Sequence, residues 1–151
     1  MSEDVPLDKV YAIEGDKDTY ERLCENLEVL PQDVRSIIST HEVYVGEGDD
    51  ISSIDGITMG NKVTLINMDI EGAEIEALKS AKETIAKDHP VLAICAYHKP
   101  DDLFTIPKLA SELYSGYRFF LRKYLSTGGS HWGGRSRLNE LVIYAIPEER
   151  R

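Results

Sequence analysis

A short apolar run that passes into an acidic turn and then into helical periodicity constrains the fold of this chain most. Residues 62–66 form a short, largely apolar and β-prone run, which is typical of a strand buried on both faces of a sheet. Residues 67–74 follow with the sequence Asn-Met-Asp-Ile-Glu-Gly-Ala-Glu. After them, helical spacing links Ile75, Leu78, Ala81 and Ile85. The segment therefore predicts a strand, an acidic turn, and a helix that ends near Lys87 and Pro90.

Two carboxylates, Asp69 and Glu71, lie in this turn at the carboxyl end of the predicted strand. In open α/β sheets, ligands bind at that edge. The two residues are two positions apart, so in a locally extended backbone both side chains point the same way. The helix start adds a positive potential that favours anionic side chains by ~0.3–1 kcal/mol. The spacing alone also fits a simpler arrangement, in which Glu71 caps the helix and Asp69 is a solvated strand end.

The first half of the chain begins with a predicted strand over residues 9–13, followed by a helix capped by Asp16 or Asp18. Residues 34–39 and 42–46 are typical of one or two strands around a turn.

The second half predicts a buried strand over residues 91–96, a short turn, and a helix that starts at Pro107 because proline breaks a helix interior. Residues 117–122 and 140–146 are predicted strands with no helix between them, so they should pair antiparallel. The pattern predicts an α/β fold, doubly wound, with a mostly parallel sheet and an antiparallel terminal hairpin. The glycine-rich connection between those two strands is either a lid that presents His131, Trp132 and Arg135 or a flexible hairpin loop.

Length and charge narrow the class of protein. A chain of 151 residues is most simply one domain, and its formal net charge of -10 argues against a nucleic-acid partner. Cys24 and Cys95 lie in apolar patterns and are expected to be reduced core residues. No apolar run is long enough to span a membrane, and the acidic start of the chain is unlike a signal peptide. These features predict a cytoplasmic protein with no membrane partner.

Three segments together resemble the FkbM-type family of S-adenosylmethionine-dependent methyltransferases. They are Val-Tyr-Ala-Ile-Glu at residues 10–14, Met-Asp-Ile-Glu-Gly-Ala-Glu at 68–74, and Tyr-His-Lys-Pro-Asp-Asp-Leu at 97–103, with the last strand at 141–146 also similar. The resemblance implies a Rossmann-like methyltransferase sheet, S-adenosylmethionine as cofactor, and O-methylation of a hydroxyl on a small molecule or glycan.

The resemblance also assigns residues. It implies that Glu14 binds the ribose hydroxyls of the cofactor, although Gly15 stands where the family often has proline. Read without the resemblance, Glu14 is a solvated loop residue. We expect Glu14, Asp69, Glu71 and Gly72 to contact the cofactor.

The catalytic expectation concerns Asp69 and His98, which end adjacent predicted strands. We expect them to be the general base that acts on the substrate hydroxyl and the partner of that base. His98 could instead be a loop histidine that is hydrogen-bonded to the backbone. Asp69, Glu71 and His98 also form a set that suits a divalent ion. Because nothing in their spacing demands a metal and sulfonium methyl transfer does not need one, no metal is expected.

One part of the family pattern does not match. The family's first strand and glycine-rich loop should precede residue 9, but residues 1–8 contain no glycine. We therefore expect residues 1–151 to form a single truncated Rossmann-like domain with the first strand and helix missing, either a fragment or a degenerate relative. The alternative function is a non-catalytic fold that binds a partner or forms a homodimer.

Overall fold

The computed structural model describes residues 7–46, 51–124 and 141–150. The strands and helices of this part alternate before the chain ends on two strands. In chain order they are β1 (Val10–Glu14), α1 (Lys17–Glu28), α2 (Gln32–Ser36), β2 (Ile38–Glu42), α3 (Ile54–Thr58), β3 (Leu65–Met68), α4 (Glu74–Ser80), α5 (Lys82–Asp88), β4 (Val91–Cys95), α6 (Asp102–Leu113), β5 (Tyr117–Lys123) and β6 (Leu141–Pro147).

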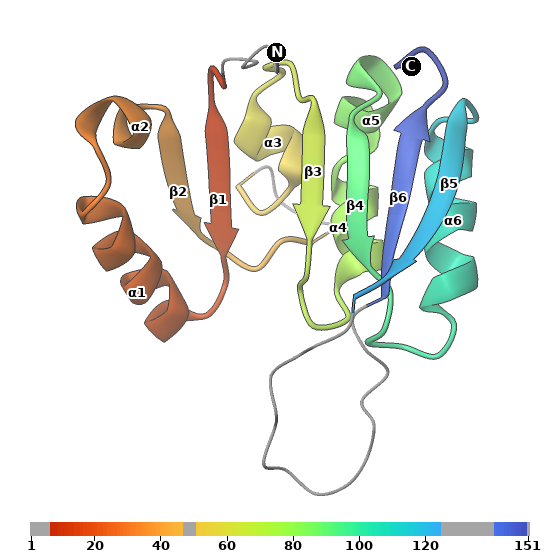
Figure 1. Cartoon of the computed structure of the whole chain (residues 1–151), viewed down its shortest axis with the longest axis horizontal. Helices are drawn as coiled ribbons and strands as arrows, with labels where there is room; N and C mark the ends of the chain where they lie inside the picture. The colour runs from red at the N-terminus through yellow and green to blue at the C-terminus, as the bar shows by residue number, and fades with distance from the viewer. Residues whose placement is uncertain (1–6, 47–50, 125–140, 151) are drawn as a thin grey trace, which may run out of the picture.

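The strands form two sheets. β1 pairs with β2 in parallel, and a second sheet has the order β3-β4-β6-β5, with β3 and β4 parallel and β6 antiparallel to both of its neighbours. Figure 1 shows the sheets side by side, with β1 next to β3 and the arrows of β1, β3 and β4 pointing the same way. The predicted α/β fold with mostly parallel strands and an antiparallel terminal pair is confirmed.

The main core lies between the four-stranded sheet and the helices drawn behind it in Figure 1. Alternate strand residues face these helices, which is why β3 has the burial pattern exposed, buried, exposed, buried. The helices contribute the positions that helical spacing identified. The largest fully buried aliphatic side chains of the strands and helices are Leu78, Ile85, Leu92, Ile94 and Ile106.

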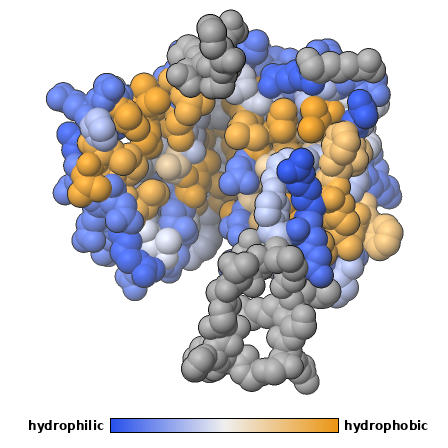
Figure 2. Space-filling view, viewed as in Figure 1, coloured by the Kyte–Doolittle hydropathy of each residue, from blue (hydrophilic) through white to orange (hydrophobic). Residues whose placement is uncertain are grey.

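The opposite face of this sheet is apolar near its centre. Ala93, Cys95 and Val142 form a small cluster there, against which Tyr97 and Tyr144 pack. Figure 2 shows apolar side chains gathered over the strands on this face.

Cationic side chains lie across the aromatic rings of the outer strand pair. The guanidinium of Arg118 lies 5.5 Å from the ring centre of Phe120, and that of Arg122 lies 5.7 Å from that of Tyr144. Both arginines are exposed.

The helix predicted after residue 74 is divided into α4 and α5 at Ala81. Asp55 of α3 explains the break, because its carboxylate accepts the N–H groups of Glu83 at 2.9 Å and Thr84 at 2.8 Å. These are first-turn donors of α5, which an acidic side chain caps.

The helix predicted to start at Pro107 was wrong, because α6 begins at Asp102 and contains that proline. The lost N–H costs one intrahelical hydrogen bond, whereas Ile106 and Ala110 on either side are fully buried in the core. The strand predicted over residues 34–39 was also wrong in its first part. Pro31 is the N-cap of α2, where its carbonyl accepts the N–H of Arg35, and β2 begins only at Ile38.

Three further expectations concern the cysteines, membrane spans and the glycine-rich connection. Cys24 is partly buried and Cys95 is buried, and neither forms a disulfide. None of the described helices is both long and apolar enough to cross a bilayer. His131, Trp132 and Arg135 lie outside the described residues, so the lid prediction stays untested.

Candidate active site at the carboxyl edge of the sheet

The turn after β3 departs from extended backbone. Glu71 has φ +56° and Gly72 has φ +98°, both in the left-handed region that favours glycine. A Cβ at Gly72 would lie 3.3 Å from Cε of Lys99, so this glycine also permits a close approach of the next loop. The prediction that Asp69 and Glu71 share an extended backbone was therefore wrong. Holding a non-glycine residue in this region costs on the order of 1–3 kcal/mol, so the surroundings must fix the turn.

Glu74, the first residue of α4, closes this turn from inside. Its side chain is 1% exposed, and its Oε1 accepts the N–H of Ile70 at 3.2 Å and that of Gly72 at 3.4 Å. The helix start has no side-chain cap from the preceding residue Ala73. Both donors precede α4, so Glu74 holds the turn together and does not cap the helix.

His98, in the loop after β4, lies among three carboxylates. Its Nδ1 is 3.0 Å from Glu74 Oε1, and its Nε2 is 3.5 Å from Asp69 Oδ1 and 3.4 Å from Glu71 Oε2. None of these contacts has the geometry of a hydrogen bond, and both ring nitrogens are buried. The distances support charge–charge attraction when the ring is protonated, while the angles exclude a well-formed hydrogen bond.

Asp69 is held by the residue before this histidine. The hydroxyl of Tyr97 donates to Asp69, at 3.0 Å from Oδ1 and 3.2 Å from Oδ2. The Tyr97 and His98 rings lie 4.2 Å apart between their centres. Asp69 is 52% exposed, whereas the side chain of His98 is 10% exposed. The carboxylate therefore faces solvent and the imidazole stands behind it.

The loop that carries Tyr97 and His98 is fixed by Asp102. Asp102 is 1% exposed and its Oδ2 accepts the N–H of Lys99 at 2.7 Å. The side chain of the N-cap residue Asp101 makes no capping hydrogen bond. Asp102 instead ties the loop to the first turn of α6.

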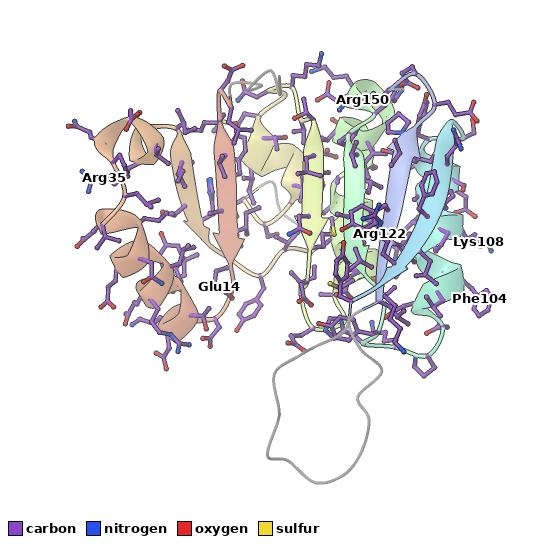
Figure 3. The ribbon with its side chains drawn as sticks, in the orientation of Figure 1. Glu14, Arg35, Phe104, Lys108, Arg122 and Arg150 are labelled. Carbon is purple, nitrogen blue, oxygen red and sulfur yellow. The ribbon has the colours of Figure 1, made fainter. Side chains whose placement is uncertain are left out.

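Glu14 lies at the carboxyl end of β1, on the same edge of the molecule (Figure 3). Its Oε1 accepts the N–H of Asp16 at 2.8 Å, which orients the carboxylate. Asp16 in turn caps α1 by accepting the N–H of Thr19 at 2.9 Å, as predicted. The strand end, the carboxylate and the helix start are therefore one connected unit.

Comparison with known proteins decides the family. The profile of the methyltransferase FkbM domain matches residues 3–125, most of the chain. The chain belongs to this family. No curated protein matches the sequence.

Solved structures place the FkbM domain among methyltransferase folds. It is similar to methyltransferase FkbM from Methylobacillus flagellatus KT, with a TM-score of 0.76 and 27% identity over 91% of this chain and 36% of that one. Precorrin-6y C5,15-methyltransferase from Geobacter metallireducens GS-15 has a TM-score of 0.58 and 17% identity over 91% of this chain and 67% of that one, which is a likeness of fold. This chain therefore spans about a third of the Methylobacillus protein.

The FkbM domain brings some of the predicted site residues together and leaves one apart. Asp69, Glu71 and His98 form one cluster, and Gly72 lies in its turn. Glu14 is on the same edge but belongs to the other sheet. Sequence reasoning missed Glu74 and Tyr97, although both lie inside the segments that carry the family resemblance. Within the described ranges, no group of three or more His, Cys, Asp and Glu side chains is arranged to hold a metal ion.

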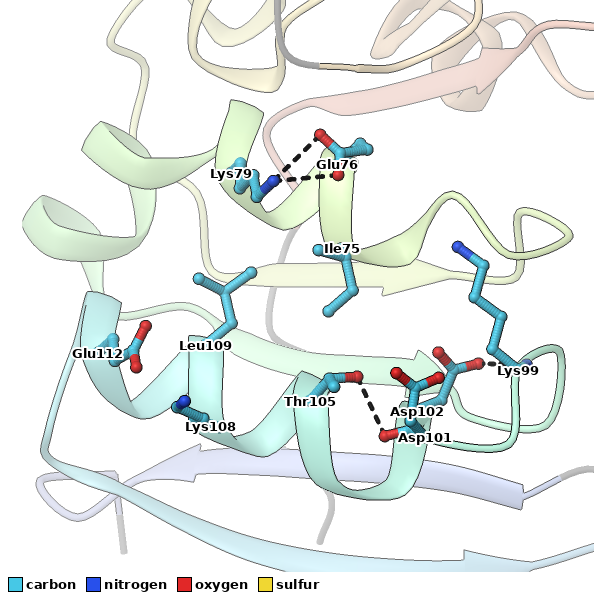
Figure 4. Close-up of a pocket in the computed structure, with 10 residues that line it drawn as sticks. All are labelled: Ile75, Glu76, Lys79, Lys99, Asp101, Asp102, Thr105, Lys108, Leu109 and Glu112. Atoms are coloured by element: carbon cyan, nitrogen blue, oxygen red, sulfur yellow. Dashed lines mark hydrogen bonds and ion pairs between the residues drawn. The ribbon is translucent and has the colours of Figure 1, made fainter.

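A groove of about 350 Å³ lies beside this site, between α4 and α6 (Figure 4). Ile75 and Leu109 contribute apolar surface, and Lys99 and Asp102 connect the groove to the loop after β4. None of the carboxylates around His98 lines it. The groove is therefore a neighbour of the candidate site, and the charged cluster is where proton transfer could occur.

Proposed function

We propose that this FkbM domain belongs to an S-adenosylmethionine-dependent methyltransferase, in which it holds the nucleoside end of the cofactor and supplies the base for a hydroxyl acceptor. The acceptor is a hydroxyl of a small molecule or glycan. The observation behind the proposal is Asp69, a half-exposed carboxylate at the carboxyl edge of a parallel strand pair.

The residues present fit the nucleoside end of the cofactor. Glu14 ends a parallel strand, and one of its oxygens is already oriented by the N–H of Asp16. A carboxylate in this place can accept hydrogen bonds from two vicinal ribose hydroxyls, as acidic residues do in dinucleotide-binding folds. When bound, S-adenosylmethionine supplies the methyl group as a sulfonium electrophile.

Asp69 is the residue that would take the proton of the acceptor hydroxyl. Tyr97 donates to both of its oxygens and so fixes the orientation of the carboxylate. The buried nitrogens of His98 cannot reach an acceptor, so His98 acts as a positioning residue behind Asp69. Glu74 lies on the other side of that imidazole, with its Oε1 3.0 Å from Nδ1.

Alignment of the two reactants lowers the barrier to methyl transfer more than a general base does. Holding two reactants in near-attack geometry can be worth ~7–11 kcal/mol, whereas a positioned base adds about 10²–10⁴-fold, or roughly 3–5.5 kcal/mol. The cofactor contact at Glu14 is therefore the first property to measure.

Calorimetric titration with S-adenosylmethionine tests the proposal. We expect binding near the micromolar range and, for Glu14→Gln, a Kd roughly 10- to 100-fold weaker, because hydrogen bonds to a charged group are lost. Glu42→Gln is the matched control, since Glu42 lies opposite Glu14 in the β1–β2 pair and is exposed. Absence of binding by the unaltered chain overturns the proposal.

A second candidate function is a binding or homodimerisation module. It is favoured by the interruption between β1 and β3, which are neighbours in Figure 1 but belong to different sheets. Strand edges that lack a partner recruit other chains. A stable dimer by light scattering, together with no binding of S-adenosylmethionine, would favour this function over methyl transfer.

A further inference from the structure

Tyr44 occupies a fixed position next to Glu14. The preceding Val43 donates its N–H to the Glu14 carbonyl at 3.0 Å, which extends the β1–β2 pairing past the end of β2. The following Val45 packs against the main hydrophobic core. Because the residues on both sides are anchored, the side chain of Tyr44 is confined to the carboxyl edge beside β1.

The ring of Tyr44 lies directly on Gly15. A Cβ at position 15 would be 2.6 Å from Cγ and Cε1 of that ring and closer still to Cδ1, which no real side chain allows. Gly15 is not in the left-handed region, so the close approach of the ring, and not the backbone conformation, requires glycine. This contact explains the departure from the family pattern, because a proline ring at position 15 would occupy the space that the tyrosine ring fills.

The ring remains available to a ligand. One side of it rests on the Gly15 backbone, and the residue as a whole is 76% exposed. A single exposed aromatic side chain is ordinary on a protein surface. Here, however, it is held one residue away from a carboxylate that suits a ribose diol.

We propose that the ring of Tyr44 stacks on the purine base of the cofactor while Glu14 holds the ribose. The inference rests on the proposed function and adds the residue that holds the base. Stacking of a base on an aromatic side chain corresponds to a change in Kd of about 5- to 150-fold. Tyr44 is thus a cofactor-binding residue.

Titration with S-adenosylhomocysteine and with adenosine tests the inference. We expect Tyr44→Leu to weaken both by about 5- to 150-fold, and Tyr44→Phe, which keeps the ring, to stay within twofold. Gly15→Ala should weaken both ligands as well, because the new Cβ displaces the ring. Phe104→Leu is the matched control, since Phe104 is also 76% exposed but lies on α6.

A second readout separates stacking from a structural effect. Saturation of the aromatic protons should transfer to the purine protons of adenosine in the unaltered chain and in Tyr44→Phe, and this transfer should be lost in Tyr44→Leu. If the unaltered chain binds, Glu14→Gln weakens binding and Tyr44→Leu does not, the inference is overturned while the proposed function stands. If neither ligand binds the unaltered chain, both are overturned.

Discussion

Asp69 is the exposed end of a short series of polar side chains that leads into the protein. Its carboxylate accepts a hydrogen bond from the hydroxyl of Tyr97, and its Oδ1 lies 3.5 Å from Nε2 of His98. Glu74, which is 1% exposed, lies on the inner side of His98. Only the outer member can meet an acceptor molecule, and the inner members restrict its orientation. A base on a restrained side chain is the arrangement that general base catalysis needs.

The first prediction follows from this exposure. Asp69→Asn keeps the acceptor oxygen for Tyr97 but removes the proton acceptor, so the rate of methyl transfer to a hydroxyl substrate should fall by about 10²–10⁴-fold. Transfer of labelled methyl groups from S-adenosylmethionine measures the effect, with Asp101→Asn as the control in the neighbouring loop. A rate within twofold of the unaltered chain would remove Asp69 from the base position.

Glu74 gives a prediction on stability. Replacing it with alanine leaves the N–H groups of Ile70 and Gly72 without their acceptor, so the free energy of unfolding should fall by about 1–3 kcal/mol. Glu74→Gln retains a carbonyl oxygen and should lose less. Urea unfolding measures both.

Glu76→Ala is the control for Glu74, because Glu76 is half exposed and its ion pair with Lys79 is worth at most about 0.5 kcal/mol. Equal losses for Glu74→Ala and Glu76→Ala would show that the turn after β3 does not depend on the buried carboxylate.

At the scale of secondary structure, the sequence predicted most strands from their apolar runs and the start of α1 from its acidic cap, but it did not predict α2 or where α5 and α6 begin. The break at Ala81 could not be predicted, because the residue that restarts the helix, Asp55, is far away in the sequence. Pro107 was misleading because burial of the helix outweighs one lost hydrogen bond.

The site itself was predicted in part. Strand order brought Asp69 and His98 together, since both follow parallel neighbours. The acidic motif after β3 contains three carboxylates, and sequence spacing cannot say which of them turns inward. That depends on the left-handed turn at Glu71 and Gly72, which directs Glu74 into the protein.

Tyr117, the first residue of β5, predicts how the free energy of unfolding depends on pH. Tyr117 is buried and donates from its hydroxyl to the carbonyl of Pro90 at 2.7 Å, and burial raises its pKa. A raised pKa in the folded state means that this contribution to stability is complete below about pH 10, the usual value in unfolded chains, and is lost as the pH rises above it.

The free energy of unfolding should therefore decline as the pH rises above about 10, and the decline should be smaller in Tyr117→Phe. Denaturant unfolding at a series of pH values measures this. Tyr114 also has a raised pKa, chiefly because it donates to Glu149, so some decline should remain in the variant. Identical profiles for the two chains would contradict the assignment.

At the scale of the whole molecule, two sheets present their parallel strands to the same edge. The β1–β2 unit carries Glu14 and Tyr44, and the four-stranded sheet carries Asp69 and His98. We therefore propose that the β1–β2 unit holds the nucleoside of the cofactor and that the four-stranded sheet meets the acceptor hydroxyl. At the opposite edge, His89 stacks on Tyr114 and forms a hydrogen bond with Glu149. We assign that edge no role in binding the cofactor or the acceptor.

The most direct test of this account is a map of backbone amide NMR shifts during titration with S-adenosylmethionine. We predict shifts at Glu14, Gly15 and Tyr44 and in the turn from Asp69 to Gly72, while His89 and Glu149 stay unchanged. Shifts confined to the edge of His89 and Glu149, or no shifts at saturating ligand, would contradict the claim that the carboxyl edge is the working face of this domain.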